Sequence, residues 1–302
     1  MSDGRITVTN LTKRYGQLPA VDNLSFTVEP GRVTGFLGPN GAGKSTTLRM
    51  ILSLARPTAG TATIDGLPYH RLPTPIRRVG AVLEASSAHP GRSGRDHLRV
   101  ICVAAGLPAS RADEVLATVG LSPAARRRVK GYSLGMLQRL GIAAALLGDP
   151  RVLILDEPAN GLDPEGIHWL RSLLRSLAEQ GRTVLVSSHL LAEMQLLADD
   201  VVIIAAGRLV RQGPVGEVVT AAQRPALLVR TPDAAELSAA LRAAGATVTA
   251  DGAGALHVTG VDAPIVARTA LASRIEVHEL TPEAPDLERA FLDLTAGRAD
   301  VR

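Results

Sequence analysis

The sequence has little cysteine and few aromatic residues. Cys102 is its only cysteine among 302 residues, and one thiol cannot close an intrachain disulfide. Disulfide-rich secreted scaffolds are therefore excluded, and a reducing compartment fits. Aromatic residues make up only 2% of the chain, which argues against the stacking surfaces that bind single-stranded nucleic acid. We expect no nucleic-acid partner.

Long apolar runs and lysines are also scarce. No apolar run approaches the roughly 20 residues that a membrane-spanning helix requires, and the N-terminus lacks the basic-then-apolar pattern of a secretory signal. Only three of the 33 basic residues are lysines, the arginines are spread along the chain, and the net charge is +4. This mild positive charge does not require nucleic acid and is compatible with a place near anionic lipid. We expect the chain to be soluble by itself.

The sequence does contain a regular alternation of strand and helix signals. Residues 1–84 are rich in strands, and residues 85–145 have helical spacing. From residue 151, near-continuous apolar strands return, with helices between them. Such strands are typical of a parallel sheet that is covered on both faces, so the sequence predicts an α/β fold.

A change of pattern around residues 212–225 indicates a domain boundary. Beyond it, the order is strand, helix, two strands in a hairpin, helix and strand, and a last helix follows. This order predicts a small α+β appendage with a ferredoxin-like fold, whose last strand is expected at 275–280. The expected domains are therefore 1–220, with a helical subdomain at about 85–145, and 225–302.

The most informative segment is a glycine-rich loop between an apolar strand and a helix. Glycines let consecutive backbone N–H groups point toward a phosphate, and the start of the helix adds a partial positive charge. Lys44 is placed to reach the β- and γ-phosphates of a nucleotide, and the Ser45 hydroxyl to bind Mg²⁺. The residues of this candidate phosphate site are Gly38, Pro39, Asn40, Gly41, Ala42, Gly43, Lys44, Ser45 and Thr46.

Acidic and histidine side chains follow two later buried strands. Asp156 and Glu157 end the apolar run 153–155, so we expect Asp156 at the Mg²⁺ ion and Glu157 as the proton acceptor of an attacking water. Another buried strand leads to the Ser-Ser-His segment 187–189. A lone histidine is usually structural, but His189 at a strand end can contact a γ-phosphate.

The segment 130–139 contains Ser133 and Gly135 at the expected start of a helix. A hydroxyl group, backbone amides and the helix dipole can together bind a phosphate there. Taken alone, the same serine is as readily explained as an ordinary helix N-cap.

Together these motifs resemble the nucleotide-binding subunits of ABC transporters over residues 5 to about 215. The glycine loop corresponds to the Walker A motif, and residues 153–157 correspond to the Walker B strand. The Ser-Leu-Gly-Met run at 133–136 corresponds to the family signature, and His189 to the switch histidine.

The resemblance implies further site residues. Tyr15 corresponds to the aromatic residue that stacks on adenine, and Asp163 belongs to the D-loop. Glu84 stands where the family normally has glutamine, so it is expected near Mg²⁺ but with an added negative charge. The signature departs from the usual Leu-Ser-Gly-Gly-Gln at three letters, although Ser133 and Gly135, which contact phosphate in the family, remain.

The resemblance also implies a fold and a function. The fold is a P-loop NTPase of the ABC type, with a β-subdomain, a RecA-like core and a helical subdomain. The ligands are ATP and Mg²⁺, and ATP is hydrolysed in a head-to-tail homodimer with Lys44, Glu157 and His189 as catalytic residues. Glu84, the Ser-Leu-Gly-Met signature and the C-terminal appendage resemble drug- and lantibiotic-resistance exporters, whose permease is a separate polypeptide. The expected location is the cytoplasm, peripherally at the inner face of the cell membrane.

Two alternatives remain open. One is a non-transport ABC ATPase of translation or DNA repair, although this sequence has neither a second cassette nor a long coiled coil between the Walker motifs. The other is a regulatory nucleotide-binding module with negligible hydrolysis, and the presence of Glu157 and His189 argues against it.

Overall fold

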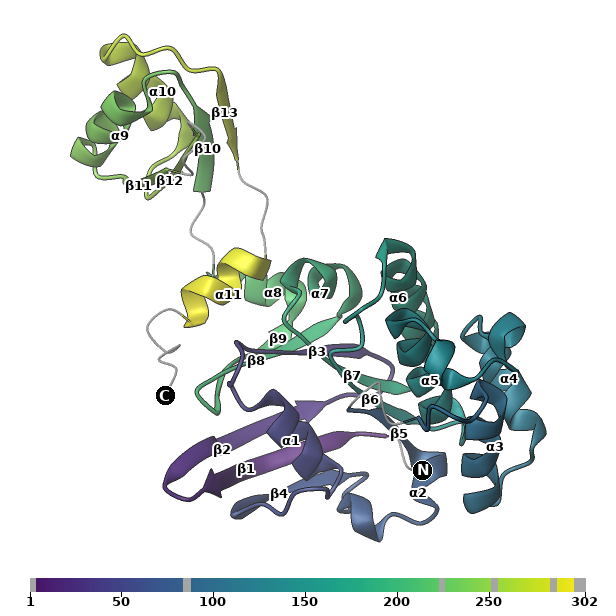
Figure 1. Cartoon of the computed structure of the whole chain (residues 1–302). Coiled ribbons are helices and arrows are strands. Elements are labelled where there is room, and N and C mark those ends of the chain that lie inside the picture. The colour runs from purple at the N-terminus through teal and green to yellow at the C-terminus, as the bar shows by residue number, and fades with distance from the viewer. Residues whose placement is uncertain (1–3, 84–87, 223–225, 251–254, 283–286, 296–302) are drawn as a thin grey trace. The chain divides into compact units, whose positions relative to one another are not determined.

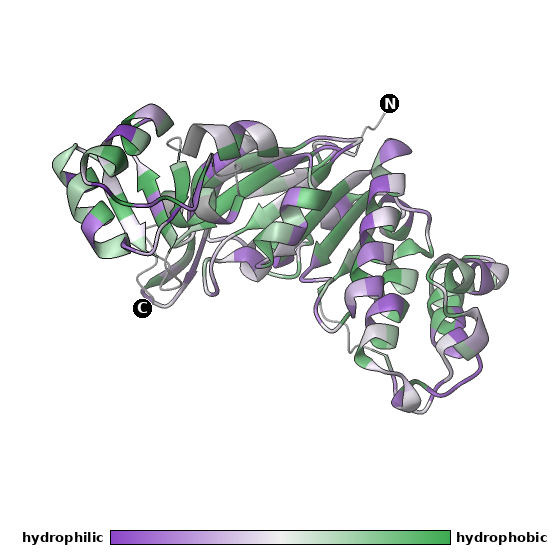
Figure 2. Cartoon of the chain, turned by 90° about the horizontal axis from the view of Figure 1, so that it is seen from above, coloured by the Kyte–Doolittle hydropathy of each residue, from purple (hydrophilic) through white to green (hydrophobic). Residues whose placement is uncertain are grey.

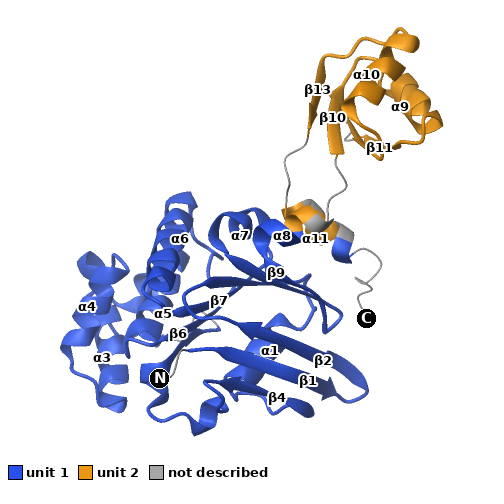
Figure 3. Ribbon diagram, turned by 180° about the vertical axis from the view of Figure 1, so that it is seen from behind, with its two compact units in different colours: residues 1–218, 294–302 blue, residues 219–293 orange. Residues whose placement is uncertain are grey.

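The computed structural model describes residues 4–83, 88–222, 226–250, 255–282 and 287–295. The chain divides into two compact units, residues 1–218 with 294–302 and residues 219–293 (Figure 3). The sequence placed the boundary between residues 220 and 225 and gave everything after it to the second domain. The division falls inside helix α8 (Val215–Ala222), within the region 212–225 where the pattern changes, and it assigns the end of helix α11 (Leu287–Thr295) to the first unit.

The first unit is built on a six-stranded sheet (Figure 1). Its strand order is β5-β6-β7-β3-β8-β9, with parallel pairing from β5 to β8 and an antiparallel β9 at the edge. Strands β3 and β7 are buried along their whole length, so the predicted α/β sheet with strands covered on both faces is confirmed. The bounds are β3 Val33–Leu37, β5 Val79–Val82, β6 Val152–Asp156, β7 Thr183–Ser188, β8 Asp200–Ala205 and β9 Arg208–Pro214.

Helices connect these strands and pack on the sheet (Figure 1). Helix α6 packs on β7 and β3 because its apolar residues Leu170, Leu174 and Leu177 recur at helical spacing and are buried. The bounds of the helices outside the helical subdomain are α1 Lys44–Ile51, α2 Pro75–Arg78, α6 Pro164–Glu179 and α7 Leu191–Leu197, with a short 3₁₀ turn at Tyr69–Arg71. Among the described residues, none of the helices combines the length and the apolar composition needed to cross a bilayer.

A second, antiparallel sheet of three strands completes the core of this unit. Its order is β2-β1-β4, with bounds β1 Ile6–Tyr15, β2 Leu18–Val28 and β4 Ala59–Ile64. The ring of Phe26 in β2 stacks on that of Phe36 in β3, with centroids 5.3 Å apart. The two sheets thus share one apolar core, and the strands carry much of the apolar sequence (Figure 2).

Helices α3, α4 and α5 pack on one another and form the helical subdomain of this unit (Figure 1). Their bounds are α3 Gly94–Ala104, α4 Ser110–Thr118 and α5 Leu134–Leu146, with 3₁₀ turns at Ser122–Ala124 and Val129–Gly131. Leu98, Leu116 and Leu140, one from each helix, are fully buried. Helix α5 also packs on strand β5 of the sheet, so it links this subdomain to the core.

The second unit has the topology that the sequence predicted. Its four strands pair antiparallel in the order β11-β12-β10-β13, and two helices contribute Leu237, Leu241 and Val266 to its core. This is the strand order of a ferredoxin-like unit. The bounds are β10 Ala226–Arg230, α9 Ala234–Ala243, β11 Thr247–Ala250, β12 Ala255–Thr259, α10 Ala263–Ala272 and β13 Glu279–Pro282.

The last strand of this unit begins later than the predicted 275–280. Ile275 is buried in the core, and its N–H donates to the Ala270 carbonyl at the end of α10. Pairing with β10 begins only at Glu279, opposite Arg230. The prediction started too early because Ile275 and Val277 are apolar where they pack on the core of this unit, not where they pair as a strand.

Candidate functional site

The glycine loop lies between β3 and α1, as its sequence context predicted. Gly41 and Gly43 have φ values of 80° and 99°, a region that favours glycine. A Cβ atom on Gly43 would lie 2.4 Å from the carbonyl oxygen of Ala20. Helix α1 begins at Lys44 without a side-chain cap, so its first amides are available to an anion.

Lys44 is held inside this loop. Its side chain is 7% exposed, and its ammonium group donates to the carbonyl oxygens of Gly38 and Pro39 at 2.6 and 3.3 Å. Burial lowers the pKa of Lys44, and the nearby charges of Glu157 and Asp156 partly oppose this shift. The loop therefore keeps a buried cation beside two carboxylates.

The topology of the sheet brings the other predicted catalytic residues to the same edge. Strand β7 lies between β6 and β3, and all three run parallel, with Asp156 opposite Ser187 and Leu37 opposite Ser188. The carboxyl ends of three neighbouring strands therefore deliver the glycine loop, the carboxylates at 156–157 and His189 to one place. This edge is where open α/β sheets bind ligands.

Glu157 occupies the centre of this arrangement. One of its carboxylate oxygens, Oε2, lies 2.6 Å from Nδ1 of His189, and the other, Oε1, lies 3.8 Å from Nζ of Lys44. Its backbone has φ of 49°, which is uncommon for a residue other than glycine and is a form of strain often found at functional sites. Glu157 thus contacts both the cation and the histidine that the sequence singled out.

Sequence reasoning missed the role of Ser187, which it treated only as part of the Ser-Ser-His segment. The Ser187 hydroxyl bonds to the carboxylate of Asp156 and to the backbone N–H of Glu157. No signal in the sequence distinguished Ser187 from Ser188, whose hydroxyl accepts from the N–H of Leu190 instead.

The signature segment begins helix α5. Ser133 is the N-cap of this helix, and its hydroxyl accepts from the N–H of Met136 at 3.2 Å, so the structure shows the N-cap alternative. Leu134 packs on Gly161, where an added Cβ would lie 2.2 Å from a Leu134 methyl carbon. Among the described residues, no hydrogen bond or ion pair joins Ser133 or Gly135 to the glycine loop.

Buried Tyr132 holds the start of this helix in place. Its hydroxyl donates to the carbonyl of Ala124 at 2.8 Å, and its ring packs against Gly94 at the start of α3. Burial raises the pKa of Tyr132. The tyrosine that replaces the first letter of the usual signature therefore serves as a packing anchor for the helical subdomain.

Asp163 and Tyr15 lie outside the cluster around Glu157. Asp163 caps helix α6, and its Oδ1 accepts from the N–H of Gly166 at 2.8 Å.

Tyr15 ends β1 and is 57% exposed, with the Lys13 ammonium group 5.1 Å from its ring centroid. Its hairpin reaches the glycine loop through Ala20, which contacts Gly43. Glu84, the third predicted metal ligand, lies outside the described residues.

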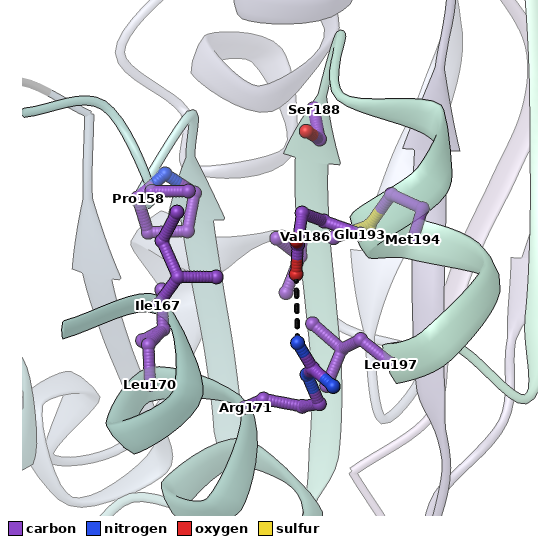
Figure 4. A pocket seen from close by; sticks show the side chains of 10 residues that line it. Pro158, Ile167, Leu170, Arg171, Val186, Ser188, Glu193, Met194 and Leu197 are labelled. Carbon is purple, nitrogen blue, oxygen red and sulfur yellow. Dashed lines mark hydrogen bonds and ion pairs between the residues drawn. The ribbon is translucent and has the colours of Figure 1, made fainter. Parts of the chain in front are cut away.

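An apolar pocket lies between α6 and α7, beside strand β7 (Figure 4). Arg171 of α6 and Glu193 of α7 form an ion pair of 3.0 Å across it. None of the glycine-loop residues lines it, and the sequence did not predict it. Its lining residues are Pro158, Ala159, Ile167, Leu170, Arg171, Val186, Ser188, Glu193, Met194 and Leu197.

The site fits ATP with Mg²⁺ better than a metal held by the protein alone. Within the described ranges, no three His, Cys, Asp or Glu side chains gather as a metal site. The candidate protein ligands are only the Asp156 carboxylate and the Ser45 hydroxyl. So small a number suits Mg²⁺, which binds one or two protein groups together with phosphate oxygens. The uncapped start of α1 and the buried Lys44 suit those phosphates.

Comparisons with known proteins agree with this geometry. The family model described as "ABC transporter" matches residues 21–160, and a domain of unknown function matches residues 225–288. A bacitracin transport ATP-binding protein of Bacillus licheniformis is 45% identical over 212 residues, 69% of each chain. A lantibiotic transport ATP-binding protein of Streptococcus pyogenes is 38% identical over 205 residues, 68% of this chain and 89% of that protein.

A solved structure has the same fold. The dimeric structure of a bacterial ABC transporter cassette matches with a TM-score of 0.64 and 25% identity, and the match covers 69% of this chain and 98% of the cassette. The similarity of the first unit in fold, motif order and sequence shows that this chain belongs to the ABC transporter family, as an ATP-hydrolysing ATP-binding subunit.

Proposed function

We propose that this chain hydrolyses ATP in a homodimer to drive a separate membrane permease that exports an antibiotic-like compound. The observation that carries the ATPase is the meeting of Lys44, Asp156, Glu157 and His189 at the carboxyl ends of three adjacent parallel strands. Export of an antibiotic is supported by the bacitracin and lantibiotic transport proteins among the relatives. The proposed location is the cytoplasmic side of the membrane, at the permease.

Each residue of the cluster has a proposed role. Lys44 and the amides of the glycine loop bind the phosphates of ATP, and Ser45 and Asp156 hold Mg²⁺, which neutralises part of the phosphate charge. Glu157 orients the attacking water and accepts its proton. His189 lies on the other side of the Glu157 carboxylate, 2.6 Å away, and from there it links Glu157 to the γ-phosphate.

The signature is proposed to act on the nucleotide of a second copy of the chain. Ser133 and Gly135 begin α5 beside Gly161, on a different part of the unit from their own glycine loop. The D-loop residue Asp163 is the N-cap of α6 and follows Gly161 by two residues. Because Gly161 packs on Leu134, Asp163 lies on the same part of the unit as the start of α5. A head-to-tail pair places both signatures over the partner's nucleotide, which makes two composite sites with isologous symmetry.

A mixing experiment tests these composite sites. Lys44→Met disables the phosphate loop of its own chain. Gly135→Asp adds a carboxylate at the signature, where a Cβ finds only ordinary contacts, 3.4 Å from the Gly161 carbonyl oxygen and 3.5 Å from a Leu162 methyl carbon. Each variant alone should lose ATPase activity. An equimolar mixture should regain about a quarter of wild-type activity, because half the dimers carry one intact site.

The doubly substituted chain provides the control. When Lys44→Met/Gly135→Asp is mixed with wild type, no mixed dimer contains an intact composite site, so activity should fall to the share of pure wild-type dimers. If the two single variants regain nothing when mixed, the loop and signature act within one chain and the composite site is wrong.

Two nucleotide contacts in this proposal come from the family resemblance. Tyr15 is proposed to stack on adenine, and its exposure at the end of a hairpin that touches the loop supports this role. Glu84 remains a proposed Mg²⁺ or water contact between the nucleotide and the permease.

Export is tested in living cells. A sensitive host expressing this chain with its permease should tolerate more bacitracin or lantibiotic than a host expressing Glu157→Gln with the same permease. Copurification of the permease with the wild-type chain should accompany the effect. Equal susceptibility of the two hosts to both antibiotics, with the permease present, would reject antibiotic export for this chain.

A further inference from the structure

The inference concerns Ser187, which lies one residue before the end of β7. Its side chain is completely buried, and it stands directly opposite Asp156 in the parallel pairing of β6 and β7. Ser187 therefore lies next to the segment Asp156–Glu157 on the neighbouring strand β6. His189 follows two residues later on the same strand end.

The Ser187 hydroxyl makes two hydrogen bonds, one in each direction. It donates its proton to Oδ1 of Asp156 and accepts from the backbone N–H of Glu157 at 2.9 Å. The Ser187 carbonyl oxygen accepts from the same N–H at 3.2 Å. The hydroxyl thus donates to the side chain of one residue and accepts from the backbone of the next, and these two residues are Asp156 and Glu157.

These two bonds constrain different parts of the site. The bond to Oδ1 fixes the rotation of the Asp156 carboxylate, because a hydrogen bond to an ionised acceptor is stronger than one between neutral groups. The bond from Glu157 holds a backbone with φ of 49°, a conformation that costs free energy and persists only where its surroundings stabilise it. A turn at this residue directs the Glu157 side chain toward Lys44 and His189.

We propose that Ser187 is a positioning residue for ATP hydrolysis, which orients Asp156 toward Mg²⁺ and Glu157 toward the attacking water. This inference rests on the proposed roles of Asp156 and Glu157. Ser187 itself touches neither substrate nor metal in this scheme. Partners that orient a metal ligand in this way typically change metal affinity or activity by about 10–100-fold when they are removed.

The same strand offers a matched control. Thr183 begins β7, is also completely buried, and its hydroxyl donates to the carbonyl of Gly4 at 2.8 Å. Ser187→Ala and Thr183→Val each delete one buried hydroxyl group with little change of shape. A purely structural role for Ser187 predicts similar effects of both substitutions, because each removes a buried hydrogen bond from β7.

The experiment measures steady-state ATPase activity against Mg²⁺ concentration, and ATP binding without Mg²⁺. For Ser187→Ala, we expect kcat to fall and the Mg²⁺ concentration at half-maximal activity to rise, each by about 10-fold or more, while Mg²⁺-free ATP binding stays unchanged. Ser187→Thr, which keeps a hydroxyl group, should recover most of the activity. Thr183→Val should keep the wild-type kcat and Mg²⁺ response.

Three outcomes decide the inference. A wild-type kcat and Mg²⁺ response in Ser187→Ala overturns it, and so does an equal loss in Thr183→Val. If Ser187→Ala does not fold, Ser187→Cys replaces it, because a thiol leaves no cavity and is only a weak donor. A wild-type Mg²⁺ response in that variant again overturns the inference. Asp156→Asn and Glu157→Gln are measured alongside, because full activity in those variants would instead contradict the proposed function.

Discussion

The substitution Glu157→Gln is expected to lower the rate of ATP hydrolysis by about 10²–10⁴-fold, the usual contribution of a general base. The amide has the size and shape of the carboxylate, so contacts with Lys44 and His189 keep their geometry. It cannot accept the proton of the attacking water at neutral pH. ATP binding should stay within a few-fold of wild type, because the phosphates are bound by the glycine loop.

The same variant should accumulate a stable dimer with ATP, because the nucleotide that holds two composite sites closed is not consumed. Light scattering on a sizing column, with and without ATP and Mg²⁺, measures this directly. Glu165→Gln is the matched control, since it makes the same change at an exposed position in the first turn of α6. A monomeric Glu157→Gln chain with full activity would contradict both the role of Glu157 as general base and the ATP-bound dimer.

The substitution Lys44→Met is expected to act one step earlier, on nucleotide binding itself. It removes the cation that the loop buries next to Asp156 and Glu157. We expect ATP affinity to fall by about 10-fold or more, because a hydrogen-bonded, buried charge typically contributes 1.5–3 kcal/mol. Hydrolysis should become undetectable, because Lys44 also stabilises charge on the transferred phosphate.

The fold should survive this change. Burial lowers the pKa of Lys44, which means that the folded protein disfavours the charged ammonium group, and methionine fills similar space without a charge. Equilibrium binding of a fluorescent ATP analogue, with urea unfolding in parallel, separates affinity from stability. Lys130→Met changes an exposed lysine before the signature and should bind ATP as wild type does. If Lys44→Met and Lys130→Met bind ATP with equal affinity, the proposed role of Lys44 in phosphate binding is wrong.

The two variants should separate ATP binding from ATP hydrolysis, although the two residues are close neighbours in the site. Glu157→Gln should bind ATP nearly as wild type does and hydrolyse it far more slowly, whereas Lys44→Met should already bind ATP more weakly, by about 10-fold or more. This separation depends on geometry, because Nζ of Lys44 and Oε1 of Glu157 are only 3.8 Å apart. If both variants lose binding equally, the effect lies in the shape of the site rather than in the chemistry of either group.

Local chemistry made the glycine loop and the sheet predictable. The loop needs glycine where φ is positive, as at Gly43, and such requirements are visible as letters at fixed spacing. The apolar runs of β6 and β7 are visible because strands buried on both faces exclude polar residues. The start of β13 was misplaced because burial of Ile275 leaves the same apolar signal as a strand.

The sequence by itself predicted a nucleotide site at Gly38–Thr46, with Asp156, Glu157 and His189 as the residues expected to act there. Only the tertiary structure decided that β7 lies between β6 and β3. That order places the Ser187 hydroxyl between the Asp156 carboxylate and the backbone N–H of Glu157, whereas the Ser188 hydroxyl accepts from the N–H of Leu190. The physical reason is that strand neighbours are chosen by long-range packing and pairing, which residue types and spacings along the chain do not record.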